Sequence, residues 1–297
     1  MAKSYLLLLF FSILLISCSK ESDPEPIDLI YHGDVFLLNQ QEVDSFSKEE
    51  YSIIDGDLVV GGLTGYNDIV SVAGLSSITE VKDLAVQSTM LTSLEGLHNL
   101  TSVSQVFIYK NSRLKAINNL SLNETTTAGL AIERNNSLED ISGFGNLQGE
   151  IYRVEINNNP LLKSLEGLDG LEVIEERLQI INNPNLENLH PLAGLTTAAS
   201  VKIINNAKLK NLEGLENLQS SSWFEIGNNE NLVSLEGLHG LTTLTKYMEI
   251  YGNKNLSNFC GLGNLVSRPN GWYIDLRISN NFINPSQEEL LNGSCSQ

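Results

Sequence analysis

The sequence predicts a mainly β protein in which one repeated unit is stacked into a solenoid of about ten coils, capped at both ends. Residues 153–203 contain the unit twice, and the copies are offset by 24 residues at every position. Each copy has an apolar-x-apolar pair, an asparagine three residues later, and then four leucines spaced three residues apart. A repeat of this length is typical of a solenoid, because each unit buries its apolar face only against its neighbours.

Apolar-x-apolar pairs mark the expected strands. Alternation at every second residue is the period of a β-strand, so both apolar side chains of a pair point toward the core. At about 4.8 Å between strands, ten coils would form a rod on the order of 48 Å long. The pairs are Leu58/Val60, Leu84/Val86, Val106/Ile108, Leu130/Ile132, Val154/Ile156, Leu178/Ile180, Val201/Ile203, Phe224/Ile226, Met248/Ile250 and Leu276/Ile278.

The second half of each unit is predicted to contain tight turns, 3₁₀ segments or short extended runs. Its leucines advance by three residues, as at Leu91, Leu94 and Leu97, and Glu-Gly or Pro often stands between them. This spacing is too short and too interrupted for an α-helix. Two segments depart from the unit. Residues 118–127 lose part of the leucine pattern and predict a loop, and residues 268–271 predict a turn that bulges from the last coil.

Residues 31–57 are expected to cap the first coil, because a terminal coil lacks one neighbour. Within them, residues 33–38 form a short apolar strand. Asn39, with Glu42 three residues later, has the pattern of a capped helix start. This strand and helix would therefore cover the open end of the solenoid.

The solenoid itself is expected to span residues 58–297 and to end in a second cap. Asn284 is the expected helix cap there, with Pro285 at the first helical position. A short helix over 287–291, stopped by Gly293, would then close the C-terminal end.

An asparagine recurs three residues after most of the predicted strands. Such a row could bind a ligand. The stronger interpretation is structural, because an inward asparagine at a bend satisfies backbone groups that the turn leaves unpaired. We term these residues the asparagine ladder: Asn111, Asn135, Asn159, Asn183, Asn206, Asn229, Asn253 and Asn281.

The N-terminal residues indicate export and lipid anchoring. Residues 1–17 combine a basic start with an apolar stretch too short to span a bilayer, which is typical of a signal peptide. They end at Cys18 in Leu-Ile-Ser-Cys, which resembles the lipobox of bacterial lipoproteins and implies a membrane anchor on that cysteine. Residues 18–30 predict a flexible tether, and their acidic residues resemble export signals of Gram-negative surface lipoproteins. A eukaryotic secretory signal with an incidental cysteine is the alternative.

Charge and cysteine content narrow the class of protein further. The formal net charge of −18 would repel a polyanion, so nucleic acid is not an expected partner. With Cys18 assigned to a lipid, Cys260 and Cys295 remain. In an oxidising compartment this pair predicts one disulfide, and two free buried thiols are the alternative.

The unit L-x-I-x-x-N-x-x-L-x-S-L-x-G-L-x-x-L resembles the leucine-rich repeat of the receptor L-domain family, which also occurs in bacterial surface lipoproteins. The match covers residues 57–295 and is best over 154–265. Residues 258–262 and 293–295 resemble the closing disulfide of the bacterial members. The resemblance implies a right-handed parallel β-solenoid that binds something outside the cell. It implies no catalytic residue and names no ligand.

Candidate catalytic and metal-binding residues are sparse. His98 and His239 occupy equivalent repeat positions about 29 Å apart, so they cannot share a metal, and neither a metal nor a cofactor is expected. Glu225 and Glu249 lie outward on adjacent coils and could act together in a polysaccharide-acting enzyme of the parallel β-helix type. Ordinary solvated charges are the simpler interpretation. The other charged outward positions are Arg153, Glu155, Arg177, Asp275 and Arg277.

Aromatic residues on the outward strand positions are the stronger functional signal, because the core does not explain them. They are Phe107, Tyr109, Trp223, Tyr247 and Tyr251, with Ile181 and Ile204 between the two groups. The last three aromatics fall on neighbouring coils, so we expect their rings to touch or nearly touch, edged by Lys202, Glu225 and Glu249.

These observations predict a monomeric, non-enzymatic recognition protein, lipid-anchored at the cell surface, that binds an extracellular protein or glycan through its outward strand face. A polysaccharide-acting enzyme and a purely structural stalk are the alternatives.

Overall fold

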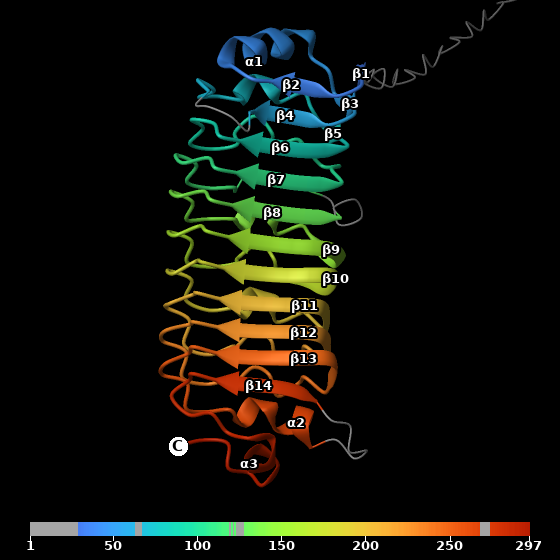
Figure 1. The fold of residues 1–297 in the computed structure, drawn as a ribbon. Coiled ribbons are helices and arrows are strands. Elements are labelled where there is room, and N and C mark those ends of the chain that lie inside the picture. The colour runs from blue at the N-terminus through green and yellow to red at the C-terminus, as the bar shows by residue number, and fades with distance from the viewer. Residues whose placement is uncertain (1–28, 63–66, 119, 121, 123–127, 268–273) are drawn as a thin grey trace, which may run out of the picture.

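The strands of the protein lie in two parallel sheets, as a computed structural model shows for residues 29–62, 67–118, 120, 122, 128–267 and 274–297. Within these residues an 11-stranded sheet follows chain order along the length of the molecule, and a 3-stranded sheet lies beside its N-terminal end (Figure 1). The helices between and beyond the strands are short. The prediction of a mainly β chain with stacked parallel strands is therefore confirmed.

The element bounds are as follows. The large sheet contains β2 (Val35–Leu37), β4 (Leu58–Gly61), β6 (Asp83–Gln87), β7 (Gln105–Tyr109), β8 (Gly129–Glu133), β9 (Gln148–Asn157), β10 (Gly170–Ile181), β11 (Thr197–Ile204), β12 (Ser220–Gly227), β13 (Thr243–Tyr251) and β14 (Asp275–Ser279). The small sheet contains β1 (Ile30–His32), β3 (Ile53–Asp55) and β5 (Glu80–Val81). The helices are α1 (Gln40–Phe46), α2 (Gly263–Val266) and α3 (Gln287–Leu291), with 3₁₀ segments η1 (Ser47–Glu49), η2 (Ala73–Leu75), η3 (Ser142–Phe144), η4 (His190–Leu192) and η5 (Cys260–Leu262).

The predicted apolar pairs stand in register across the large sheet. Val201 pairs with Phe224, and Phe224 pairs with Met248. The pairs from β4 to β13 are buried, whereas Leu276 and Ile278 are only partly buried because β14 is the last strand. The apolar strand predicted as part of the N-terminal cap, β2, joins the same sheet as a further rung.

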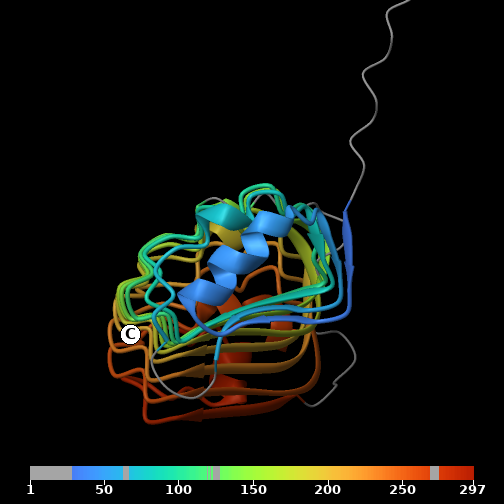
Figure 2. The same cartoon turned by 90° about the horizontal axis from the view of Figure 1, so that it is seen from above.

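The returning segments between the strands lie to one side of the large sheet, and α1 lies across the N-terminal end (Figure 2). The leucines that advance by three residues are buried, and the 3₁₀ segments η2, η3, η4 and η5 lie in this part of the repeat, as the leucine spacing predicted. Each coil therefore buries its leucines against the strands and against the coils on either side.

Stacking of the returning segments depends on glycine at Gly214. Its φ is +108°, and a Cβ atom there would lie 2.1 Å from the carbonyl oxygen of Leu189 in the preceding coil. Gly214→Ala is expected to lower the free energy of unfolding by about 2–4 kcal/mol, because the backbone is strained for any side chain and the clash is with main chain. Urea denaturation measures this loss. Gly263→Ala, where a Cβ meets nothing within 4 Å, is the control, and an equal loss there would contradict the explanation.

Each side chain of the asparagine ladder joins its own coil to the preceding one. Nδ2 of Asn183 donates to the carbonyl of Ile156 (2.7 Å), and its Oδ1 accepts the N–H of Asn159 (3.0 Å). Equivalent bonds recur along the ladder. At the N-terminal end, Thr89 takes the ladder position and donates both its N–H and its hydroxyl to Oδ1 of Asn111. The ladder residues are thus scaffold, placed to pair buried backbone groups.

The residue before each ladder position has a left-handed backbone. In five coils it is an asparagine with φ between +53° and +59°. Asparagine tolerates this region better than most residues with side chains, which explains the repeated Asn-Asn dipeptide. Asn182 also donates to Asn158 (2.9 Å) and accepts from Asn205 (2.7 Å), forming a second, more exposed row of bonds.

The two caps follow the expected plan with one correction. Asn39 caps α1, and its Oδ1 accepts the N–H of Glu42 (2.9 Å). At the other end, α3 begins as expected, but Ser286 is its cap and forms a capping box with Glu289. The assignment of Asn284 as cap, with Pro285 at the first helical position, is wrong, because Oδ1 of Asn284 instead accepts the N–H of Asn281 (3.0 Å) and terminates the ladder.

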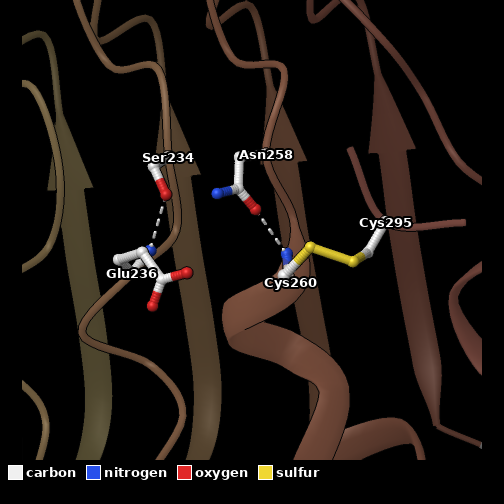
Figure 3. The surroundings of a disulfide bond; sticks show 5 residues. All are labelled: Ser234, Glu236, Asn258, Cys260 and Cys295. Carbon is white, nitrogen blue, oxygen red and sulfur yellow. Dashed lines mark hydrogen bonds between the residues drawn. A yellow bond between two sulfur atoms is a disulfide. The ribbon is translucent and has the colours of Figure 1, made fainter. Parts of the chain in front are cut away.

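The predicted disulfide between Cys260 and Cys295 is confirmed (Figure 3). It joins residues 35 apart in the chain, with their Cα atoms 4.9 Å apart. Oδ1 of Asn258 accepts the N–H of Cys260 (2.9 Å), and in the preceding coil Oγ of Ser234 accepts the N–H of Glu236 (3.0 Å) at the same place. The disulfide therefore ties the C-terminal segment to a turn that belongs to the regular repeat.

Several predictions fall on residues outside the described ranges. They are the signal peptide, Cys18 and the tether up to residue 28, most of the loop over 118–127, and the turn over 268–271.

Candidate functional site

The outward face of the large sheet carries the candidate site. Outward positions flank and separate the two core residues of each strand, so they form rows that run along the molecule. Pairing places Trp223 beside Tyr247, Glu225 beside Glu249, and Gly227 beside Tyr251. The residues predicted as the C-terminal aromatic group therefore lie on the adjoining strands β12 and β13.

Trp223 and Tyr247 each contact a cation rather than another ring. Trp223 is 39% exposed, and Nζ of Lys246 stands 3.9 Å from the centre of its ring. The guanidinium of Arg277 lies 4.8 Å from the ring centre of Tyr247. Among the described residues, the ring pairs in contact do not include Trp223, Tyr247 or Tyr251, although Trp223 and Tyr247 are paired on adjoining strands. The site is a mixed surface of aromatic faces and cationic side chains.

Tyr251 is fixed against the sheet. Its ring covers Gly227, where an added Cβ would lie 2.4 Å from the ring, and its hydroxyl donates to Oε1 of Glu225 (2.9 Å). Burial, followed by the neighbouring carboxylate of Glu225, raises the pKa of Tyr251 to about 12. Tyr251 therefore remains a protonated donor at any physiological pH.

Glu225 is held on both oxygens, since Oε2 pairs with Nζ of Lys202 (2.8 Å) while Oε1 accepts from Tyr251. A carboxylate engaged in this way is better suited to holding neighbouring side chains than to transferring a proton. Glu249 lies between Glu225 and Arg277 in the register of the sheet. The two glutamates are thus adjacent, as expected.

Phe107 and Tyr109 form a separate group on β7. Their rings stack with centres 5.4 Å apart. Nζ of Lys110 and the guanidinium carbon of Arg134 lie 5.0 Å and 5.7 Å from the ring centre of Tyr109. The strand β7 is five places from β12 in the sheet, which corresponds to about 24 Å. The predicted aromatic residues therefore form two sites rather than one continuous patch, with Ile181 and Ile204 partly buried between them.

The remaining charged outward residues pair with neighbours on the same face. Nε of Arg177 lies 2.6 Å from Oε1 of Glu155, and Nη2 of Arg153 donates to Gln105 (2.6 Å). Arg277 also pairs with Asp275. These charged side chains are therefore engaged by polar neighbours, and each contact contributes little to stability because it is partly solvated.

The histidines do not converge. His98 and His239 are exposed on the returning segments. Nε2 of His190 lies 3.4 Å from Oε2 of Glu213. Within the described residues, no group of three or more His, Cys, Asp or Glu side chains is arranged to hold a metal ion.

The sequence did not single out Lys246, which covers the most exposed aromatic ring of the site. Strict alternation would not place residue 246 on the same face as its neighbour Tyr247. The register of β12 against β13 shifts between Ser221 and Trp223, and that irregularity brings Lys246 over Trp223. A basic residue beside an outward aromatic was the available signal.

A scan against models of known protein families gives no match for this chain, and a search of curated proteins gives none either. Among the helices that the structure describes, none has the length and apolar character needed to cross a membrane.

Proposed function

We propose that this chain is a lipid-anchored, non-catalytic recognition protein of the cell surface, which binds an extracellular protein or glycan through the outward face of its large sheet. The observation that carries the proposal is Trp223, an exposed aromatic on a strand face with Lys246 over it and Tyr247 beside it. Aromatic rings next to cationic and carboxylate groups suit both protein and sugar ligands. The engagement of both Glu225 oxygens favours binding over a polysaccharide-acting enzyme.

The architecture we propose is a right-handed parallel β-solenoid of the leucine-rich, receptor L-domain-like type, working as a monomer without a cofactor. The repeat period, the strand order and the asparagine ladder support it. Such a scaffold has a rigid face, because from β6 onward each coil is bonded to the next through both the sheet and the ladder. A purely structural stalk would use the same scaffold but would not need Trp223 exposed.

The binding role is tested with Trp223→Ala/Tyr247→Ala on glycan and peptide arrays. The double variant is expected to lose array signals by about tenfold or more, because flat aromatic faces dominate such contacts. Phe282→Ala is the matched control, since Phe282 is 63% exposed and lies beyond β14. Unchanged signals in the double variant would contradict the proposal. So would turnover of a polysaccharide that Glu225→Gln abolishes.

The anchor is tested separately at Cys18. Metabolic labelling with a fatty acid is expected to mark the wild-type chain and to fail in Cys18→Ala, because the thiol is the proposed point of acylation. Cell fractionation would then place the wild type with the outer membrane. Cys260→Ala, which leaves the lipobox intact, should remain labelled. Label that persists in Cys18→Ala would remove the anchor from the proposal.

A further inference from the structure

The middle residue of each apolar-x-apolar pair points outward, and on five successive strands this residue is apolar. Sheet pairing aligns them from β2 to β8. On the following strands, β9 to β14, the same position is charged or polar: Glu155, Gln179, Lys202, Glu225, Glu249 and Arg277. We term the first set the N-terminal apolar row: Phe36, Val59, Ala85, Phe107 and Ala131.

The fold does not explain this row. The strand pairing continues through both halves of the sheet, and in the C-terminal half charged or polar side chains occupy the same position. Phe36 is 59% exposed, and Val59, Ala85 and Phe107 are only partly buried, whereas Ala131 at the end of the row is buried. The two phenylalanine side chains stand three strand spacings apart, about 14 Å, with smaller side chains between them. Contiguous apolar side chains of this kind on a solvated face indicate a binding surface.

Three aspartates, Asp34, Asp57 and Asp83, lie two residues before Phe36, Val59 and Ala85, beside the first three members of the apolar row. Oδ1 of Asp34 accepts the N–H of Asp57 (3.0 Å), and Asp57 and Asp83 directly precede Leu58 and Leu84, which pair in the sheet. Nζ of Lys82 pairs with Oδ1 of Asp57 at 3.3 Å. Burial, and then the charge of Asp57, raises the pKa of Asp83. Within the described part of the chain, Oδ1 of Asp83 is buried without a hydrogen bond. The three aspartates therefore have more negative charge than their neighbours balance.

We propose that the N-terminal apolar row and the aspartates Asp34, Asp57 and Asp83 form a docking surface for a polypeptide segment of a partner protein, one that carries apolar side chains flanked by lysine or arginine. The inference rests on the proposed recognition role of this face and names the partner class for its N-terminal half. Apolar side chains would cover the row, and the flanking cations would pair with the aspartates. A second copy of this chain, at net charge −18, and an anionic membrane surface both lack the complementary charge.

The test is fluorescence anisotropy with the purified full chain and a labelled amphipathic peptide of about 14 leucine and lysine residues, at about 50 mM NaCl. Wild type is expected to bind this peptide and to bind its leucine–glutamate counterpart at least about tenfold more weakly. Phe36→Ser/Phe107→Ser and Ala85→Arg should each weaken binding about tenfold, the first by removing apolar area and the second by repulsion. Ala85→Arg retains the phenylalanines and so covers the case in which the double variant fails to fold.

Lys82→Ala tests directly whether the aspartates attract the basic peptide. It frees Asp57, so affinity for the basic peptide should rise about threefold, whereas Lys163→Ala, which frees Glu139 on the returning segments, should leave it unchanged. Equal effects of the two lysine variants, or no effect of the row variants, would overturn the inference. So would self-association of the wild type that Phe36→Ser/Phe107→Ser abolishes. If only Trp223→Ala/Tyr247→Ala weakens binding, this inference falls while the proposed function stands. If neither double variant weakens binding, this inference falls, and the array experiment with Trp223→Ala/Tyr247→Ala decides the proposed function.

Discussion

Asn183→Ala is expected to lower the free energy of unfolding by about 2–4 kcal/mol. The side chain is fully buried and bonds the preceding coil through both of its polar atoms, at Ile156 and at Asn159. Alanine would leave the carbonyl of Ile156 and the N–H of Asn159 buried without these partners, and it would also leave a small cavity. Equilibrium denaturation in urea, with an unchanged slope against urea concentration, measures the loss.

The control for this variant is another asparagine of the same chain. Asn217 is exposed and donates one hydrogen bond, to the carbonyl of Ala193 (2.8 Å). Asn217→Ala is expected to cost about 0.5 kcal/mol or less, since water can replace the bond. A similar cost for the two variants would show that burial of the ladder does not matter, which would contradict the structural role assigned to it.

Cys260→Ser/Cys295→Ser is expected to lower stability by about 4 kcal/mol in the loop-entropy model, given the 35 residues that separate the cysteines. The loss should be local. In a stacked repeat each unit contacts only its neighbours, so the C-terminal end would open before the rest. Hydrogen exchange should therefore accelerate in α3 and β14, while β6 and β7 keep their protection.

Reduced wild-type protein serves as the matched comparison, because it lacks the bond but keeps both sulfur atoms. Its exchange pattern should match that of the double serine variant. Uniform acceleration along the whole chain would contradict the prediction and would show that the molecule opens as one cooperative unit.

The repetitive part of the molecule was accessible from the sequence, whereas its exceptions were not. Core positions such as Val154 and Leu178 repeat because every coil meets the same packing requirement, so one period predicts all of them. Asn284 shows the limit. Asn-Pro ahead of a polar stretch is a typical helix start, yet the final ladder residue, Asn281, needed a partner, and that tertiary demand determined the role of Asn284.

The outward face was harder to predict, because the repeat constrains only the residues that point into the core. The period imposes nothing on residues that point to solvent, so their arrangement follows from side-chain contacts that vary between coils. Lys246 reaches Trp223 through an irregularity in strand pairing, and Tyr251 finds room for its ring because residue 227 is glycine. The apolar row is visible in the sequence, since its members are the middle residues of successive apolar-x-apolar pairs, but of these only Phe107 is an aromatic within the predicted repeats.

The asparagine ladder also gives the molecule a direction. Each rung completes the coil before it and depends on the coil after it, from Thr89 at one end to Asn284 at the other. The bonds of one rung do not depend on the total number of rungs in the ladder. A whole unit of 24 residues, such as that from Asn159 to Asn182, could therefore be removed or duplicated with every bond re-formed, provided both terminators remain. The length of the outward face of the large sheet can thus change by whole repeat units while the core of each coil stays the same.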